Sequence, residues 1–114
     1  MNKQKLIDNI HYWDAKVLDL DIKHFADEID LKCEAGELYF LECYELEVKH
    51  TPKFNKEIPA RQWEYKNLPY TIHEIKVVED YSSNVTKLNV EIIMPPMFIK
   101  LTCNDIRVNK YGGK

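Results

Sequence analysis

One eight-residue pattern occurs twice in this chain and constrains its fold more than any other feature. The first copy spans residues 41–48 and the second spans residues 101–108, and both read Leu-x-Cys-x-acid-aliphatic-x-Val. In each copy apolar and polar residues alternate, slip by one position, and then alternate again. Alternation with a period of two is typical of a strand, and a one-residue slip needs a bulge or bend to keep apolar side chains on the buried face. The pattern therefore predicts two long strands that bend at the same place.

The residues around these copies predict four further strands and one short helix. Turn-forming residues separate the strands, with Gly36 after the second strand and Pro95-Pro96 after the fifth. Residues 3–10 place aliphatic side chains on one helical face, so we expect a short N-terminal helix that docks on a sheet. The expected strands span residues 16–25, 28–34, 38–50, 70–79, 85–94 and 97–109. The side chains expected to face inward include Leu18, Leu20, Ile22, Ile29, Leu31, Cys33, Leu88, Val90 and Ile92.

The 114 residues are predicted to form a single domain, residues 1–114, of the all-β class and mainly antiparallel. Each half supplies a three-stranded meander, one within residues 14–50 and one within residues 70–109, and residues 51–69 link them. Two such meanders can pack as a sandwich or curve into an open barrel. A duplication explains the internal repeat, and a chance match between two alternating strands is the alternative.

Several kinds of chemistry are disfavoured by the composition. The three glycines form no phosphate-binding loop, and the four histidines are too scattered to supply a compact set of metal ligands. Three cysteines without a CxxC pair favour buried, reduced thiols over a disulfide framework or a zinc site. A nucleophilic pairing of Cys43 or Cys103 with His73 is conceivable, but inward-facing thiols are usually inert. We therefore expect neither catalysis nor a cofactor.

The sequence also predicts where the protein acts. The first residues carry charge but no apolar segment of the kind found in a signal peptide. No apolar run approaches the roughly 20 residues that a membrane span needs. We therefore expect a cytoplasmic protein without a membrane partner.

Charge is distributed unevenly along the chain. Residues 14–47 hold eleven acids and three bases, a net charge of −8, whereas residues 48–114 carry +4, residues 1–13 carry +1, and the total is −3. A general nucleic-acid binder would be basic throughout, so nucleic acid is not an expected partner. The acids form either a solvated sheet face or a surface for a basic protein, since carboxylates facing each other across strands repel. The acids proposed to bind such a partner are Asp19, Asp21, Glu45 and Glu47.

The linker of residues 51–69 contains three prolines, which exclude a central strand. It also carries Arg61, Trp63 and Tyr65. These side chains either cover one end of the core or serve as anchors for a partner, because Trp, Tyr and Arg dominate the hot spots of protein interfaces.

Two segments carry a resemblance to a known group of proteins: His11-Tyr-Trp-Asp-Ala-Lys-Val17 before the first strand, and Leu38-Tyr-Phe40 in the third. They resemble small β-rich bacterial proteins that begin with a short helix and a His-Asp-(Ser/Ala)-x-(Val/Ile) box. Trp13 stands where the box has its histidine. Members include uncharacterised cytoplasmic proteins and proteins thought to give immunity against polymorphic toxins. The resemblance implies a bacterial protein-binding domain and carries over no catalytic residues. Without it, Trp13 is interpreted as a core anchor.

The sequence as a whole predicts a cytosolic bacterial domain that is not an enzyme and that binds a basic protein. Its most concrete form is an immunity protein that neutralises a toxin. One alternative is a small-molecule binder with an apolar cavity lined by Phe40, Ile92 and Leu101. Another is a symmetric oligomer, such as a homodimer, whose function lies in assembly.

Overall fold

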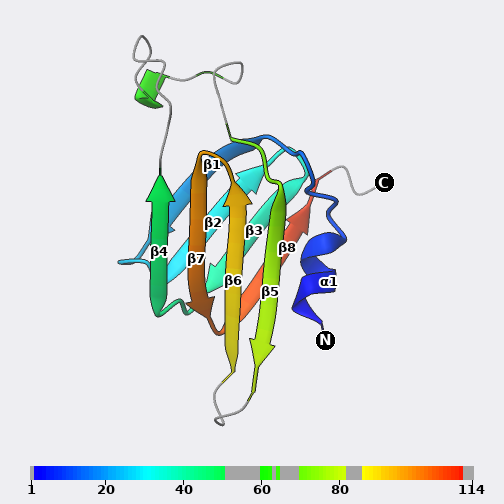
Figure 1. The fold of residues 1–114 in the computed structure, drawn as a ribbon, viewed down its shortest axis with the longest axis vertical. Coiled ribbons are helices and arrows are strands. Elements are labelled where there is room, and N and C mark those ends of the chain that lie inside the picture. The colour runs from blue at the N-terminus through cyan, green and yellow to red at the C-terminus, as the bar shows by residue number, and fades with distance from the viewer. Residues whose placement is uncertain (1, 51–59, 63, 65–69, 82–85, 112–114) are drawn as a thin grey trace.

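The computed structural model describes residues 2–50, 60–62, 64, 70–81 and 86–111, and most of their regular secondary structure is strand (Figure 1). Apart from the helix α1 (Lys3–Asp8) and the short 3-10 turn η1 (Ala60–Gln62), the regular elements of these residues are strands. The strands are β1 (Val17–Lys23), β2 (Glu28–Cys33), β3 (Gly36–Leu41), β4 (Glu45–His50), β5 (Glu74–Asp80), β6 (Lys87–Met94), β7 (Met97–Cys103) and β8 (Asp105–Lys110). The prediction of an all-β fold with a short N-terminal helix is confirmed.

Two antiparallel sheets of four strands form the layers of a sandwich (Figure 1). One sheet has the order β1-β2-β3-β8 and the other has the order β4-β7-β6-β5. Each sheet therefore contains one of the predicted three-stranded meanders together with a fourth strand from the other half of the chain. β4 leaves the first meander to pair with β7, and β8 leaves the second to pair with β3. The sheets remain separate and do not close into a barrel.

The predicted bend in each repeated segment occurs where the chain passes from one sheet to the other. The first segment breaks between β3 and β4, where Glu42 has a φ of 55°, and the second breaks at Asn104 between β7 and β8. Backbone hydrogen bonds tie the two crossings together. The Tyr44 N–H donates to Thr102 O at 3.0 Å, and the Asn104 N–H donates to Leu41 O at 3.2 Å. The one-residue slip in the alternation of each segment therefore indicates the place where the chain passes from one sheet to the other.

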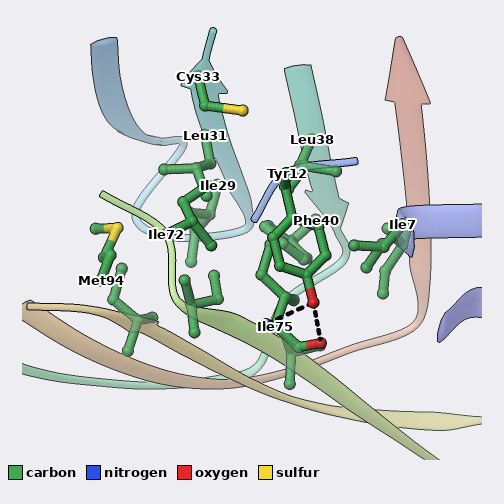
Figure 2. Close-up of a cluster of buried hydrophobic side chains, with 14 of the residues drawn as sticks. Ile7, Tyr12, Ile29, Leu31, Cys33, Leu38, Phe40, Ile72, Ile75 and Met94 are labelled. Atoms are coloured by element: carbon green, nitrogen blue, oxygen red, sulfur yellow. Dashed lines mark hydrogen bonds between the residues drawn. The ribbon is translucent and has the colours of Figure 1, made fainter. Parts of the chain in front are cut away.

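Aliphatic side chains fill the core between the sheets, and Tyr12 and Phe40 are its largest fully buried members (Figure 2). The inward positions predicted for β2 and β6 are buried as expected: Ile29, Leu31, Cys33, Leu88, Val90 and Ile92. Phe40, Ile92 and Leu101, considered above as the lining of a ligand cavity, are at most 3% exposed and pack within this core. Burial of this apolar surface is the main force that holds the two sheets together.

The first strand departs from its predicted burial pattern. Leu18 is 37% exposed and Ile22 is 47% exposed, although both are expected to face inward, and Leu20 is only partly buried. The physical reason is position in the sheet. β1 is an edge strand whose register shifts between Val17 and Asp19, and it lies at the end of its sheet where the described elements give it little cover.

Helix α1 covers the edges of β5 and β8 on one side of the sandwich (Figure 1). The side chain of Gln4 takes the place of a neighbouring strand, because its Nε2 donates to Ile75 O at 2.8 Å and its Oε1 accepts from the Val77 N–H at 2.6 Å. Lys3 Nζ donates to Ile106 O on β8 at 3.2 Å. One side of the sandwich is thereby protected, and the strands farthest from α1 are β1 and β4.

Candidate protein-binding surface

The four acids proposed to bind a partner lie on two edge strands. β1 carries Asp19 and Asp21, β4 carries Glu45 and Glu47, and all four are exposed. β1 and β4 are the ends of their respective sheets that lie away from α1. We call the side of the sandwich that these two strands border the β1–β4 side (Figure 1). The acids therefore belong to two sheets and border one side, instead of forming a single sheet face.

Three of these carboxylates form no ion pair within the described part of the chain, although Lys32 lies opposite Asp19 and Lys100 opposite Glu47 in the register. Asp21 lies 4.0 Å from Lys23 Nζ. Asp19, Glu45 and Glu47 make no ion pair or side-chain hydrogen bond with another described residue. The negative charges of these three carboxylates are therefore exposed mainly to solvent.

Lys23 is mainly engaged by a buried acid of β2. Its Nζ lies 2.8 Å from Asp30 and 4.0 Å from Glu28, and the Asp30 side chain is only 6% exposed although the alternation of β2 predicts that it faces solvent. The hydrogen bond to Asp30 and the charge of Asp30 raise the pKa of Lys23, and a hydrogen bond shared with Asp30 raises the pKa of Glu28. The positive charge of Lys23 therefore mainly compensates the negative charge of Asp30, and Lys23 forms no ion pair with Glu45 or Glu47 of β4.

Exposed apolar side chains accompany these acids. Phe25 is fully exposed at the tip of the β1–β2 turn, where His24, Phe25 and Ala26 have φ values of 51°, 55° and 71°. Non-glycine residues rarely adopt this left-handed region, and they persist there where the surrounding structure enforces it. Tyr44 is 47% exposed and Val48 is 40% exposed. A hollow of about 150 Å³ joins the turn to the beginning of β4 and is lined by Phe25, Ala26, Cys43, Tyr44, Glu45 and Leu46.

The outer face of the β4-β7-β6-β5 sheet carries a shallow trough of mixed charge. Glu47 lies opposite Lys100 in the register, and Lys100 Nζ is 3.9 Å from Glu91. A hollow of about 570 Å³ is lined by Glu45, Leu46, Glu47, Asn89, Val90, Glu91, Lys100, Leu101 and Thr102. An adjoining hollow of about 200 Å³ adds Lys49 and Phe98 to Glu47 and Lys100. An open, charged trough of this kind suits the side chains of a protein better than an enclosed small molecule.

The linker residues of the predicted site are only partly described. Arg61 lies in η1 and is exposed. Trp63 and Tyr65 lie outside the described residues, so their predicted contribution to binding stays a prediction.

Cys33 and Cys103 are buried, and Cys43 is partly buried. Burial raises the pKa of the Cys33 thiol. Cys43 and Cys103, which occupy the same position of the two repeated segments, share a hydrogen bond that lowers the pKa of Cys43 and raises that of Cys103. Cys43 Sγ also donates to Phe40 O at 3.3 Å, so the described partners of Cys43 are a backbone carbonyl and another thiol, not His73. In the part of the chain that the structure covers, no group of three or more His, Cys, Asp or Glu side chains could hold a metal ion.

Comparison with known protein families identifies a family whose sequence model matches this chain. The sequence model of the family described as immunity protein PIM7 matches residues 1–110, which include every described strand. The chain belongs to this family of immunity proteins. A comparison with curated proteins gives no match. The predicted resemblance to immunity proteins is confirmed by the family match. As for membranes, none of the described helices has the length and apolar character to cross one.

Proposed function

We propose that this immunity protein neutralises a basic toxin by binding it in the bacterial cytoplasm, that it catalyses no reaction, and that the β1–β4 side makes the contact. The observation that carries the proposal is the set of exposed carboxylates Asp19, Glu45 and Glu47, which form no ion pair among the described residues. Lys32 and Lys100 lie opposite Asp19 and Glu47 in the register, but their ammonium groups pair with Glu37 and Glu91 instead. Membership of an immunity protein family supports a role in inhibition.

Charge and apolar area would play different parts in such a complex. An exposed ion pair contributes only about 0.2–1 kcal/mol, so the carboxylates would act mainly on the rate of encounter and on the choice of a basic partner. Binding free energy would come mainly from desolvated aromatic and aliphatic side chains, for which Phe25, Tyr44 and Val48 are suited. Arg61, Trp63 and Tyr65 are proposed as further contacts from the linker.

The test is protection against the toxin domain encoded beside the gene of this protein. Cells that express the toxin domain should grow only when the immunity protein is present. The variant Glu45→Lys/Glu47→Lys should lose protection, and its affinity for the purified toxin domain should fall by about tenfold or more, because attraction becomes repulsion. Affinity of the unaltered protein should also fall as salt is raised.

The matched control is Glu74→Lys, which is compared with the single variant Glu47→Lys, since both make the same change in net charge and Glu74 is exposed on β5, away from the β1–β4 side. This control should protect as well as the unaltered protein. Equal protection by all variants would remove the β1–β4 side from the proposal. An unaltered protein that neither binds the toxin domain nor protects against it would contradict the proposed function itself.

A further inference from the structure

The four edge strands of the sandwich differ in how their outer backbone is protected. On β5, the side chains of Gln4 and Tyr12 hydrogen-bond the free backbone groups of the strand. On β8, Lys3 donates to a backbone carbonyl. On β1, the register shifts between Val17 and Asp19, and irregularities of this kind discourage the addition of another strand.

β4 has none of these protections among the described residues. Its six residues pair with β7 in unbroken register, from Glu45 opposite Thr102 to His50 opposite Met97. No described strand pairs with its other side. All of its residues except Leu46 are exposed. A regular and uncovered edge offers its N–H and C=O groups to an incoming strand.

The side chains of β4 specify what kind of strand would fit. Glu45, Glu47 and Lys49 lie on the outer face of the sheet, whereas Leu46 and Val48 lie opposite buried residues of β7 and so face the other layer. A strand added beside β4 would place its own side chains alternately next to these two kinds of residue. Basic residues would therefore match Glu45 and Glu47, an acidic or polar residue would match Lys49, and apolar residues would match the inner face.

We propose that β4 receives an extended segment of the toxin as a fifth strand of the β4-β7-β6-β5 sheet, in which basic and apolar residues alternate beside residues 45–48. The inference rests on the proposed function and specifies its central contact. A segment that pairs with all six residues of β4 would extend about 20 Å. The hollow beside Phe25 and Tyr44, at the beginning of β4, would hold an apolar side chain at one end of that segment.

A second copy of this chain is the other strand that could add to β4, and charge argues against it. Residues 14–47 carry a net charge of −8 in every copy. Pairing two β4 strands would bring two such acidic segments together, including Asp19 and Asp21 on the neighbouring edge. In an antiparallel pair of β4 strands Lys49 of each copy could stand opposite Glu45 of the other, so it is the wider charge of −8 that opposes a second copy. A basic toxin strand would meet attraction both at Glu45 and Glu47 and from that wider charge.

Hydrogen exchange with the purified toxin domain tests the inference on the unaltered protein. Within residues 45–50, the backbone amides that point away from β7 should exchange about tenfold more slowly in the complex than in the free protein, because pairing with the added strand occupies them. Binding without such protection would overturn the strand addition and leave the proposed function standing. Slow exchange of the same amides in a free protein that is already a dimer would assign the edge to a second copy and overturn the inference as well.

Two proline variants separate backbone pairing from side-chain contact. Successive N–H groups of an edge strand face alternately toward its neighbour and away from it, so one of Glu47→Pro and Val48→Pro keeps the hydrogen bonds of β4 to β7. That variant, recognised by an unchanged melting temperature, should lose about tenfold or more in toxin affinity. The controls Glu47→Gln and Val48→Thr change the same side chains but keep the N–H, and the stable proline variant should bind about tenfold or more weakly than the control at its own position. Unchanged affinity of the stable proline variant overturns the inference, and if neither variant folds, the exchange experiment decides. An unaltered protein that binds no toxin ends both proposals.

Discussion

At the scale of single residues, Tyr12 joins the N-terminal segment to the core. It is 1% exposed, and its hydroxyl accepts from the Ile75 N–H at 3.0 Å and donates to Ile75 O at 3.2 Å (Figure 2). Its ring stacks on Trp13, with centroids 4.4 Å apart. The interpretation of Trp13 as the core anchor is wrong, since Trp13 is 49% exposed and Tyr12 is the buried member of the pair.

Replacing Tyr12 with phenylalanine should destabilise the protein by about 1–3 kcal/mol, because the N–H of Ile75 would lose its partner in a buried place, whereas Ile75 O would keep its hydrogen bond from Gln4. Urea unfolding at neutral pH measures the change. The control Tyr81→Phe removes an exposed hydroxyl that bonds to Glu79 and should alter stability by less than about 0.5 kcal/mol. Equal effects of the two variants would contradict the structural role of the Tyr12 hydroxyl.

The same residue predicts a response to alkaline pH. Burial, the largest effect, raises the pKa of Tyr12, so the folded state holds the phenol proton more tightly than the unfolded state. This contribution to stability is fully present below the ordinary tyrosine pKa near 10 and is lost as pH rises through the folded pKa. Unfolding series from pH 8 to 11 should therefore show a smaller decline for Tyr12→Phe than for the unaltered protein. Parallel declines would show that Tyr12 does not contribute.

At the scale of elements, α1 depends on the ion pair that ties it to β8. Lys3 Nζ lies 2.9 Å from Asp105, and the hydrogen bond from Lys3 is the main cause that lowers the pKa of Asp105. Its contribution is present above the ordinary aspartate pKa near 3.9 and is lost as pH falls through the lowered value. Since the Asp105 side chain is 37% exposed, solvent screening keeps this contribution small.

Asp105→Asn should therefore lower stability at pH 7 by less than about 1 kcal/mol and have a smaller effect as the pH is lowered toward 2, because the carboxylate becomes protonated and the ion pair is lost. Unfolding by urea at the two pH values measures this difference. In a Lys3→Met background the same substitution should matter less at pH 7, because the partner of the carboxylate is gone. A loss of equal size at both pH values would contradict the ion pair as the cause.

The elements that could be predicted are those whose burial follows from their own alternation. β2 and β6 lie inside their sheets, so neighbours cover them and the apolar face is buried. β1 has the same alternation but lies at an edge, and sequence alone does not show which strand is left uncovered. The acids of the candidate site could be predicted because the sequence shows charged residues directly. Their division between two sheets could not be predicted, because it depends on the pairing of β4 with β7 in the other sheet. Phe25 was missed because an aromatic residue in a turn without glycine gives only a weak signal.

At the scale of the whole molecule, the two halves of the chain exchange their last strands. β4 pairs with β7 and β8 pairs with β3, and each ladder joins six residue pairs that lie far apart in the sequence. The crossings meet where the two repeated segments bend, at Tyr44 and Asn104. Each sheet therefore receives its fourth strand from the other half of the chain. Such long-range pairing makes the sandwich one cooperative unit.

This exchange predicts that the chain can be cut between β4 and β5 without falling apart. A protease site inserted within residues 51–59 would divide α1 to β4 from η1 to β8, yet both exchanged ladders and the contact of α1 with β5 still join the pieces. Native mass spectrometry after cleavage should show one complex of unchanged mass, which separates into two pieces only in denaturant. Either piece made alone should lack a cooperative unfolding transition, because it would hold three strands of one sheet and a fourth strand without its partner, with the apolar face exposed. Mixing the two pieces should restore the transition of the uncut protein that carries the same insertion. A piece that folds cooperatively on its own would show that the halves are independent and that strand exchange contributes little to their stability.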